Sequence, residues 1–195
     1  MPKIIWCGNK SWDTDFPENT LPNNAKRIER PDNIFKSSLL YGILPLIFSY
    51  AIIWIKWFII DERAMNPIYV PLGIILGLLL MPVHEVLHGV CYKKGQKVYI
   101  GICLKKSAAF AVCHEPISKR RFIMMSLMPM LLGIIPLAIF LLSPPNAFLS
   151  GICIPMGIIG MLSPMPDYMD VHIICKQVPK GAFVHTQNDG FYWYK

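Results

Sequence analysis

Two histidines stand four residues apart at positions 84 and 88, with a glutamate directly after the first, in an HExxH pattern. Residues four apart lie on the same face of an α-helix, one turn apart, so the His84 and His88 imidazoles can converge on one ion. Imidazole pairs at this spacing are typical zinc ligands. Glu85 is then beside the ion, where its carboxylate can act as general base in hydrolysis. The pattern predicts a zinc-dependent peptidase site, with Zn²⁺ as cofactor.

Catalytic zinc sites use three protein ligands, so the chain must supply a third. The acidic and histidine side chains available for this role are His114, Glu115, Asp167, Asp170, His172 and His185. Asp167 lies near the end of an apolar stretch that runs in the same direction as the one bearing the histidines. We therefore expect its carboxylate to lie at the same depth in the membrane as the two imidazoles. Asp170, three residues later on the same helical face, is the alternative ligand. The competing interpretation is that both aspartates simply begin a polar tail.

Four apolar stretches must carry these residues, at 37–60, 68–90, 122–142 and 147–165. Charged residues make up 16% of the chain, against roughly a quarter in soluble domains, and they are concentrated between the stretches. A helix needs about 20 apolar residues to cross a bilayer, and continuous apolar runs favour helices over the alternating strands of a barrel. A soluble protein of 195 residues could hardly bury four such stretches. We therefore expect an all-α integral membrane protein with four transmembrane helices.

Ionisable side chains are rare within these stretches, and each needs an explanation. Lys56 lies near one end of the first stretch, where its amine can extend to the bilayer surface. Glu85 is the only acidic residue of the second stretch. A charged group within a transmembrane helix costs about 3 kcal/mol on insertion scales and marks a functional site. The alternative is that these are polar residues of a helix end at the headgroup level.

A short β-rich segment separates the second and third stretches. Residues 97–104 and 108–113 are rich in strand-forming side chains, and residues 105–107 form the turn between them. We expect a small β-hairpin whose free edge could pair with an extended substrate, although a plain connector explains the segment equally well. The expected division of the chain is a cytoplasmic N-terminal tail at 1–36, a membrane-embedded metallopeptidase core at 37–166 and a C-terminal cytoplasmic segment at 167–195.

Lysine and arginine are distributed unevenly between the apolar stretches. They are numerous in both tails and in the segment 91–121, and they are scarce in the links 61–67 and 143–146. Basic residues collect on the cytoplasmic side of a membrane, so we expect both termini and the central segment to be cytoplasmic in a multi-pass protein of the cell membrane. The net charge of +7 has the same origin, since no nucleic-acid recognition motif accompanies it. The expected partner is the lipid bilayer, and not nucleic acid.

The order of these features resembles a known family. The HExxHG pattern in an apolar stretch is followed by the β-rich segment, a Ser-Lys-Arg-Arg stretch at 118–121, a Ser-Leu-Met-Pro run at 126–129 and a late aspartate. This order, over about residues 68–175, resembles the DUF3267 zincin peptidases, which are similar to site-2 intramembrane metalloproteases. The resemblance implies an intramembrane zinc peptidase with His84 and His88 as ligands and Glu85 as base. The chain departs from the Gly-Asp or Leu-Asp-Gly context usual for the third ligand, and the Asn-Pro element of the site-2 group is not evident.

Three classes of function are compatible with these observations. The leading one is a zinc metalloendopeptidase that hydrolyses peptide bonds in or near the membrane, with a peptide or membrane protein as substrate. The alternative is a non-catalytic scaffold or regulator that binds zinc within the membrane. An ion transporter using intramembrane histidine and aspartate is disfavoured, because the chain has no inverted repeat.

Overall fold

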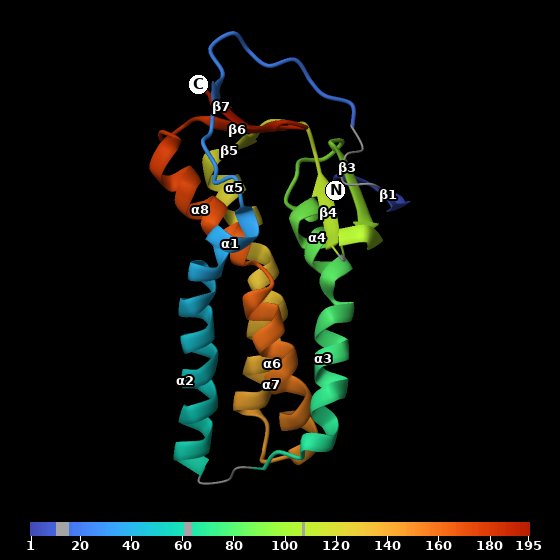
Figure 1. Cartoon of the computed structure of the whole chain (residues 1–195), viewed down its shortest axis with the longest axis vertical. Helices are drawn as coiled ribbons and strands as arrows, with labels where there is room; N and C mark the ends of the chain where they lie inside the picture. The colour runs from blue at the N-terminus through green and yellow to red at the C-terminus, as the bar shows by residue number, and fades with distance from the viewer. Residues whose placement is uncertain (11–15, 61–63, 107) are drawn as a thin grey trace. The chain divides into compact units, whose positions relative to one another are not determined.

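A computed structural model of the chain describes residues 1–10, 16–60, 64–106 and 108–195 (Figure 1). The chain forms two compact units, and each is assembled from segments that are far apart in the sequence. The first unit contains Met1–Ile34, Pro82–Met128 and Asp167–Lys195, and the second contains Phe35–Met81 and Pro129–Pro166. All predicted site residues lie in the first unit. The second unit is helical in its described part.

Four helices form the second unit, and small residues allow them to pack closely. They are α2 (Ile43–Ile60), α3 (Val70–Leu79), α6 (Leu131–Leu142) and α7 (Ala147–Leu162). Helices α6 and α7 lie between α2 and α3 in Figure 1, and α7 contacts the other three. A Cβ atom at Gly160 would overlap the backbone of Leu132 and Gly133 on α6. Helices in lipid use such small residues because close backbone approach replaces the hydrophobic driving force.

Four segments are helical, long and apolar enough to cross a membrane, as the four predicted stretches require. They are Ile34–Ile59, Pro67–Val90, Lys119–Leu142 and Ala147–Gln177. Several contain a local break: the second joins α3 to α4 (Met81–Val90), the third joins α5 (Lys119–Leu127) to α6 through a 3₁₀ turn, and the fourth joins α7 to α8 (Met165–Gln177). Their orientation remains a prediction, and residues 61–63 of the first link lie outside the described residues.

The predicted hairpin is confirmed, and the N-terminal segment adds a third strand to it. Strands β3 (Lys97–Cys103) and β4 (Ala108–Val112) pair antiparallel, with Ile100 opposite Ala111. The predicted turn falls at a 3₁₀ turn and Ser107, and Ser107 lies outside the described residues. Strand β1 (Lys3–Asn9) runs parallel to β3, so the order is β1-β3-β4. We call these three strands sheet A.

A second sheet makes the expectation of an all-α protein wrong. Sheet B has the order β2-β7-β6-β5 and is antiparallel throughout. Its strands are β2 (Lys26–Arg27), β5 (Ile117–Ser118), β6 (Phe183–Gln187) and β7 (Gly190–Tyr194). Two of these strands are only two residues long, which is too short for an alternation of apolar and polar residues to be recognised in the sequence. The fold is therefore a set of apolar helices combined with two small sheets.

The core of the first unit connects both sheets to the helices that bear the site. Buried side chains come from α5, α8 and the strands, and they include Val98, Ile100, Phe122, Ile174 and Val184. Phe122 meets Phe191 of β7 edge to face, with ring centroids 5.6 Å apart. The last turn of α4 contacts sheet A, because a Cβ at Gly89 would lie 3.2 Å from Ile100 Cδ1. This packing fixes α4, α5 and α8 within one unit.

Candidate metal centre

Helix α4 places both histidines of the HExxH pattern on one side. Pro82 falls in its first turn, where the missing N–H costs no hydrogen bond. His84 is 5% exposed, and His88 is partly buried. Their Nε2 atoms are 3.1 Å apart, and the two rings meet edge to face with centroids 4.8 Å apart. The four-residue spacing therefore brings one nitrogen of each ring to the same point.

Asp167 reaches the histidines from the first turn of α8. The chain leaves α7 through a turn at residues 163–164 and begins α8 at Met165. Asp167 Oδ2 is 3.3 Å from His84 Nε2, and Oδ1 is 3.3 Å from His88 Nε2. Within the described parts of the chain, these three residues are the group whose ligand atoms could hold a metal ion, all within 4.8 Å of one another.

The spacing of the nitrogen and oxygen atoms leaves room for one metal ion between the three side chains. Zinc bonds of about 2.0–2.1 Å at the tetrahedral angle put neighbouring ligand atoms about 3.3 Å apart. The separations here are 3.1 Å between the imidazole nitrogens and 3.3 Å from each nitrogen to a carboxylate oxygen. Two imidazoles and a carboxylate are also a donor set that would suit a zinc ion.

A backbone contact from α5 orients one of the two rings. His88 Nδ1 donates a hydrogen bond to the carbonyl oxygen of Met125, 3.1 Å away. A carbonyl only accepts, so the ring proton is on Nδ1, and Nε2 presents its lone pair toward Asp167. Metal-ligating histidines are commonly held in this way, because the second hydrogen bond fixes both tautomer and ring orientation. Met125 was not predicted as part of the site.

Glu85 lies beside the cluster. It follows His84 on α4, and its side chain is partly buried. Its carboxylate is close enough to His84, His88 and Asp167 for their charges to act on it. Glu85 does not belong to the group of three ligand atoms. A carboxylate in this position can exchange a proton with a water or a leaving nitrogen at the cluster.

Asp170, the alternative ligand, faces an arginine from the N-terminal segment. Arg30 Nε is 3.0 Å from Asp170 Oδ1, and Arg30 Nη2 is 2.8 Å from Oδ2. The arginine also lies over the Phe191 ring, with its Cζ 4.4 Å from the centroid. The structure thus places Asp170 in a bidentate ion pair, and Asp167 against the histidines. Arg30 was not predicted from the sequence. A signal for it would have been that a buried Asp170 carboxylate needs a positively charged partner.

A protein-family model matches the part of the chain that contains His84, His88 and Asp167. The match covers residues 77–183, more than half of the chain, and the description of that family, DUF3267, is "Putative zincin peptidase". The chain belongs to the DUF3267 family. No curated protein and no solved structure matches the chain. The DUF3267 segment includes α4, the β3–β4 hairpin and α8, but it begins after Arg30 and β1.

The other histidines considered as ligands lie apart from the cluster in this DUF3267 protein. His114 Nδ1 donates to the carbonyl oxygen of Pro17, at 3.0 Å. His185 Nε2 donates to the carbonyl oxygen of His114, at 2.9 Å. Both histidines are buried beside sheet B, whereas His172 is exposed on α8. Neither they nor Glu115 belong to the group around His84.

Proposed function

We propose that this protein is a zinc-dependent metalloendopeptidase that hydrolyses peptide bonds in or near the membrane. The observation that carries the proposal is the convergence of His84, His88 and Asp167, whose ligand atoms lie within 4.8 Å of one another, with Glu85 beside them. The family description supports the same chemistry. Two imidazoles and a carboxylate form a ligand set that favours zinc over calcium or magnesium, which prefer oxygen alone.

Each residue has a distinct role in this mechanism. His84, His88 and Asp167 would hold the ion, and Met125 orients His88 through its carbonyl oxygen. Zinc supplies Lewis acidity, which polarises a carbonyl group and acidifies water. Glu85 accepts the proton of the attacking water and then donates it to the amine that leaves, so one carboxylate serves as base and acid in turn.

The substrate that we infer is an extended segment of a peptide or membrane protein. Strand β4 pairs with β3 and, within the described residues, with no other strand, so its outer edge offers backbone donors and acceptors. Strand β3, the partner of β4, packs against Gly89, the residue after His88, so the hairpin is joined to the end of α4 that bears the site. An added strand is a common way to hold a peptide in an extended conformation.

The experiment that tests the enzyme proposal is replacement of Glu85 by Gln in purified, zinc-loaded protein. Glu85→Gln keeps the size of the side chain and leaves all three ligands in place, so bound zinc stays at wild-type stoichiometry. Hydrolysis of an unfolded, dye-labelled protein substrate falls by about 10²–10⁴-fold, the usual contribution of a general base. The matched control is Glu29→Gln, an exposed acid of the same unit, with unchanged hydrolysis.

The same variant separates the enzyme from a zinc-binding scaffold or regulator. A scaffold needs the metal and its ligands, but it has no use for Glu85 as a base. Retention of the protein's cellular effect in Glu85→Gln, combined with its loss in a His84→Ala and His88→Ala double variant, contradicts the enzyme proposal and favours the scaffold.

We further propose that the protein crosses the cell membrane several times, with both termini cytoplasmic. The basic tails and central segment support this orientation. In a variant whose Cys7 and Cys175 are replaced by serine, cysteines at Lys10 or Lys180 should react with a membrane-impermeant maleimide only after cells are opened. A cysteine at Pro144, between α6 and α7, should react in intact cells, and the reverse pattern rejects the orientation.

A further inference from the structure

The two segments of the chain that form sheet A are rich in lysine. Residues 1–10 and 86–114 contain all three strands, and they include seven lysines and no aspartate or glutamate. The lysines are Lys3, Lys10, Lys93, Lys94, Lys97, Lys105 and Lys106. The structure describes the side chains of six of these lysines, and all six are exposed. A surface with one sign of charge attracts a partner of the opposite sign.

The outer strand of this sheet also exposes large apolar side chains. Ile4 is 42% exposed and Trp6 is 58% exposed. They are two residues apart on a strand and therefore share one face of the sheet. Leu104, at the far end of β3, is 65% exposed. Tryptophan is enriched where one side of a ring meets hydrocarbon and the other meets water, as at a membrane surface.

Packing within the first unit places this face against the last turn of α4. Ile4 Cδ1 lies 3.9 Å from the position of a Cβ on Gly89, so the face that bears Ile4 and Trp6 is the one turned toward α4. Gly89 is in the last turn of the apolar segment Pro67–Val90. The end of a membrane-spanning helix lies at the level of the lipid headgroups. The contact with Gly89 therefore keeps sheet A close to the residue at which this apolar segment ends.

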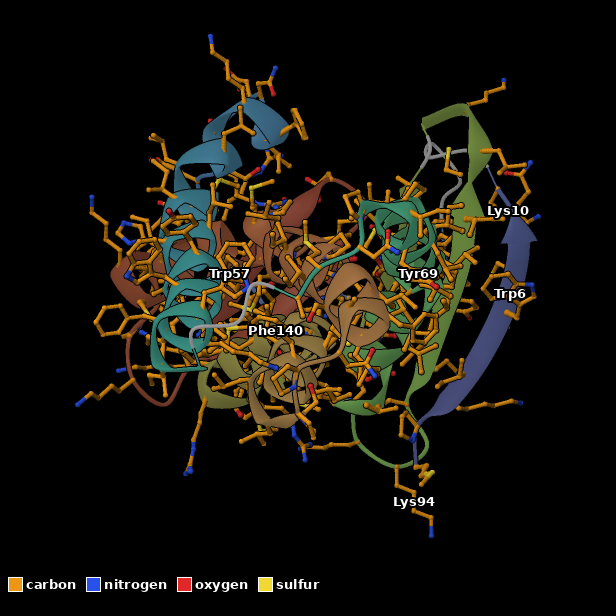
Figure 2. The ribbon with its side chains drawn as sticks, turned by 90° about the horizontal axis from the view of Figure 1, so that it is seen from below. Trp6, Lys10, Trp57, Tyr69, Lys94 and Phe140 are labelled. Atoms are coloured by element: carbon orange, nitrogen blue, oxygen red, sulfur yellow. The ribbon has the colours of Figure 1, made fainter. Side chains whose placement is uncertain are left out.

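We propose that sheet A binds the surface of an anionic bilayer through Ile4 and Trp6 of β1 and the lysines around them. Trp6 inserts its ring among the headgroups, and the ammonium groups pair with phosphates of anionic lipids. Figure 2 shows Trp6 on β1, with Lys10 beyond one end of the strand and Lys94 near the other. The apolar residues are therefore flanked by cations along the strand, as in segments that bind anionic lipid headgroups.

A lipid surface explains these features better than an acidic protein does. A protein partner has to approach a face that is already beside the membrane, whereas lipid headgroups are present there at all times. Lipid binding depends on neither zinc nor hydrolysis, so the proposal is independent of the peptidase function. Its consequence is that the hairpin β3–β4, joined to β1 through β3, is held at the bilayer surface.

The test compares the full-length protein in nanodiscs of phosphatidylcholine alone and of phosphatidylcholine mixed with phosphatidylglycerol. The chain has five tryptophans, so the Trp6 signal is taken as the difference between wild type and Trp6→Phe. We expect anionic lipid to shift this signal to shorter wavelength, to increase its quenching by lipids with brominated chains, and to decrease its quenching by iodide. Hydrogen exchange of the β1 amides in the wild type should slow in the same comparison, and this readout needs no variant.

Charge-matched variants decide whether the lysines of sheet A cause the effect. Replacement of Lys3, Lys10 and Lys97 by glutamine should abolish the difference between the two lipid compositions. Replacement of three exposed C-terminal lysines, Lys176, Lys180 and Lys195, should preserve it. Equal iodide quenching of Trp6 in both compositions, or an equal loss in both triple variants, overturns the proposal. Unaltered circular dichroism of each variant excludes unfolding as the cause.

Discussion

Arg30 binds both carboxylate oxygens of Asp170, with Nε 3.0 Å from Oδ1 and Nη2 2.8 Å from Oδ2. Asp170 lies one turn after Asp167 on α8, so two carboxylates share one stretch of helix. The guanidinium balances the charge of one carboxylate and leaves the other to face His84 and His88. This division of partners distinguishes the two aspartates that the sequence left as alternatives.

Replacement of Asp167 by asparagine should weaken zinc binding far more than replacement of Asp170 does. Asn removes the negative charge at the two 3.3 Å contacts with the histidines. We expect a loss of tenfold or more in zinc affinity for Asp167→Asn, since even outer residues of metal sites contribute tenfold to a hundredfold. Metal analysis and chelator competition measure it. Zinc content that is normal in Asp167→Asn but lost in Asp170→Asn would identify Asp170, and not Asp167, as the third ligand.

Loss of Arg30 should destabilise the first unit through the unpaired Asp170 carboxylate. The two side chains are 22% and 10% exposed, so most of the pair is out of water. Removing one member of a buried pair costs about 3 kcal/mol, because the remaining charge keeps its desolvation penalty. Denaturant unfolding of Arg30→Ala should show this loss, and adding Asp170→Asn should restore part of it. Strictly additive effects in the double variant would mean that the pair is not coupled.

The convergence of His84, His88 and Asp167 was predictable from the sequence, because it follows largely from local rules. Helical periodicity alone places the imidazoles of His84 and His88 on one face. The depth of Asp167 within its apolar stretch favoured it over His114, which the structure places near sheet B. The first argument uses spacing within one helix, and the second also assumes that two apolar stretches running in the same direction pack together.

Pairings between segments that are far apart in the sequence could not be predicted, because they do not follow from local rules. Strand β1 pairs with β3, and Arg30 pairs with Asp170, across separations that no local pattern records. Lys56 was expected to extend to the bilayer surface, and this is wrong: it is 3% exposed and donates to the carbonyl oxygens of Phe140 and Ser143 at the end of α6. The unpaired carbonyls of a helix end provide this alternative to water.

Stability of the folded protein should decrease as the pH falls below the usual pKa of histidine. Burial lowers the pKa of His185 from 6.5, because desolvation disfavours the charged ring. Its Nε2 donates to the His114 carbonyl, and its buried Nδ1 has no hydrogen-bond partner in the described structure. The unfolded chain therefore binds a proton that the folded one resists. This contribution to stability is present above about pH 6.5 and is lost between that pH and the lower folded-state pKa.

Thermal unfolding between about pH 7.5 and pH 5 measures this effect. The wild type should lose stability over the interval, and His185→Gln should lose less, because its side chain does not titrate. His172→Gln, at an exposed histidine, is the control and should retain the wild-type slope. The zinc-ligand histidines are common to all three proteins, so their titration cancels in the comparison. Identical slopes for the wild type and His185→Gln would contradict the prediction.

Substitution of Gly160 by alanine should disrupt the packing of α7 against α6. The new Cβ would overlap backbone atoms of Leu132 and Gly133, which cannot rotate away as a side chain can. We expect a loss of about 3 kcal/mol or more, at the upper end of overpacking effects. The matched control is Gly77→Ala on α3, where the three atoms nearest to the new Cβ all belong to the Ile159 side chain, the first of them at 3.1 Å. Thermal unfolding in detergent should rank the wild type first, Gly77→Ala slightly below and Gly160→Ala far below. Equal losses in the two variants would show that backbone contact between α6 and α7 does not set the stability of this unit.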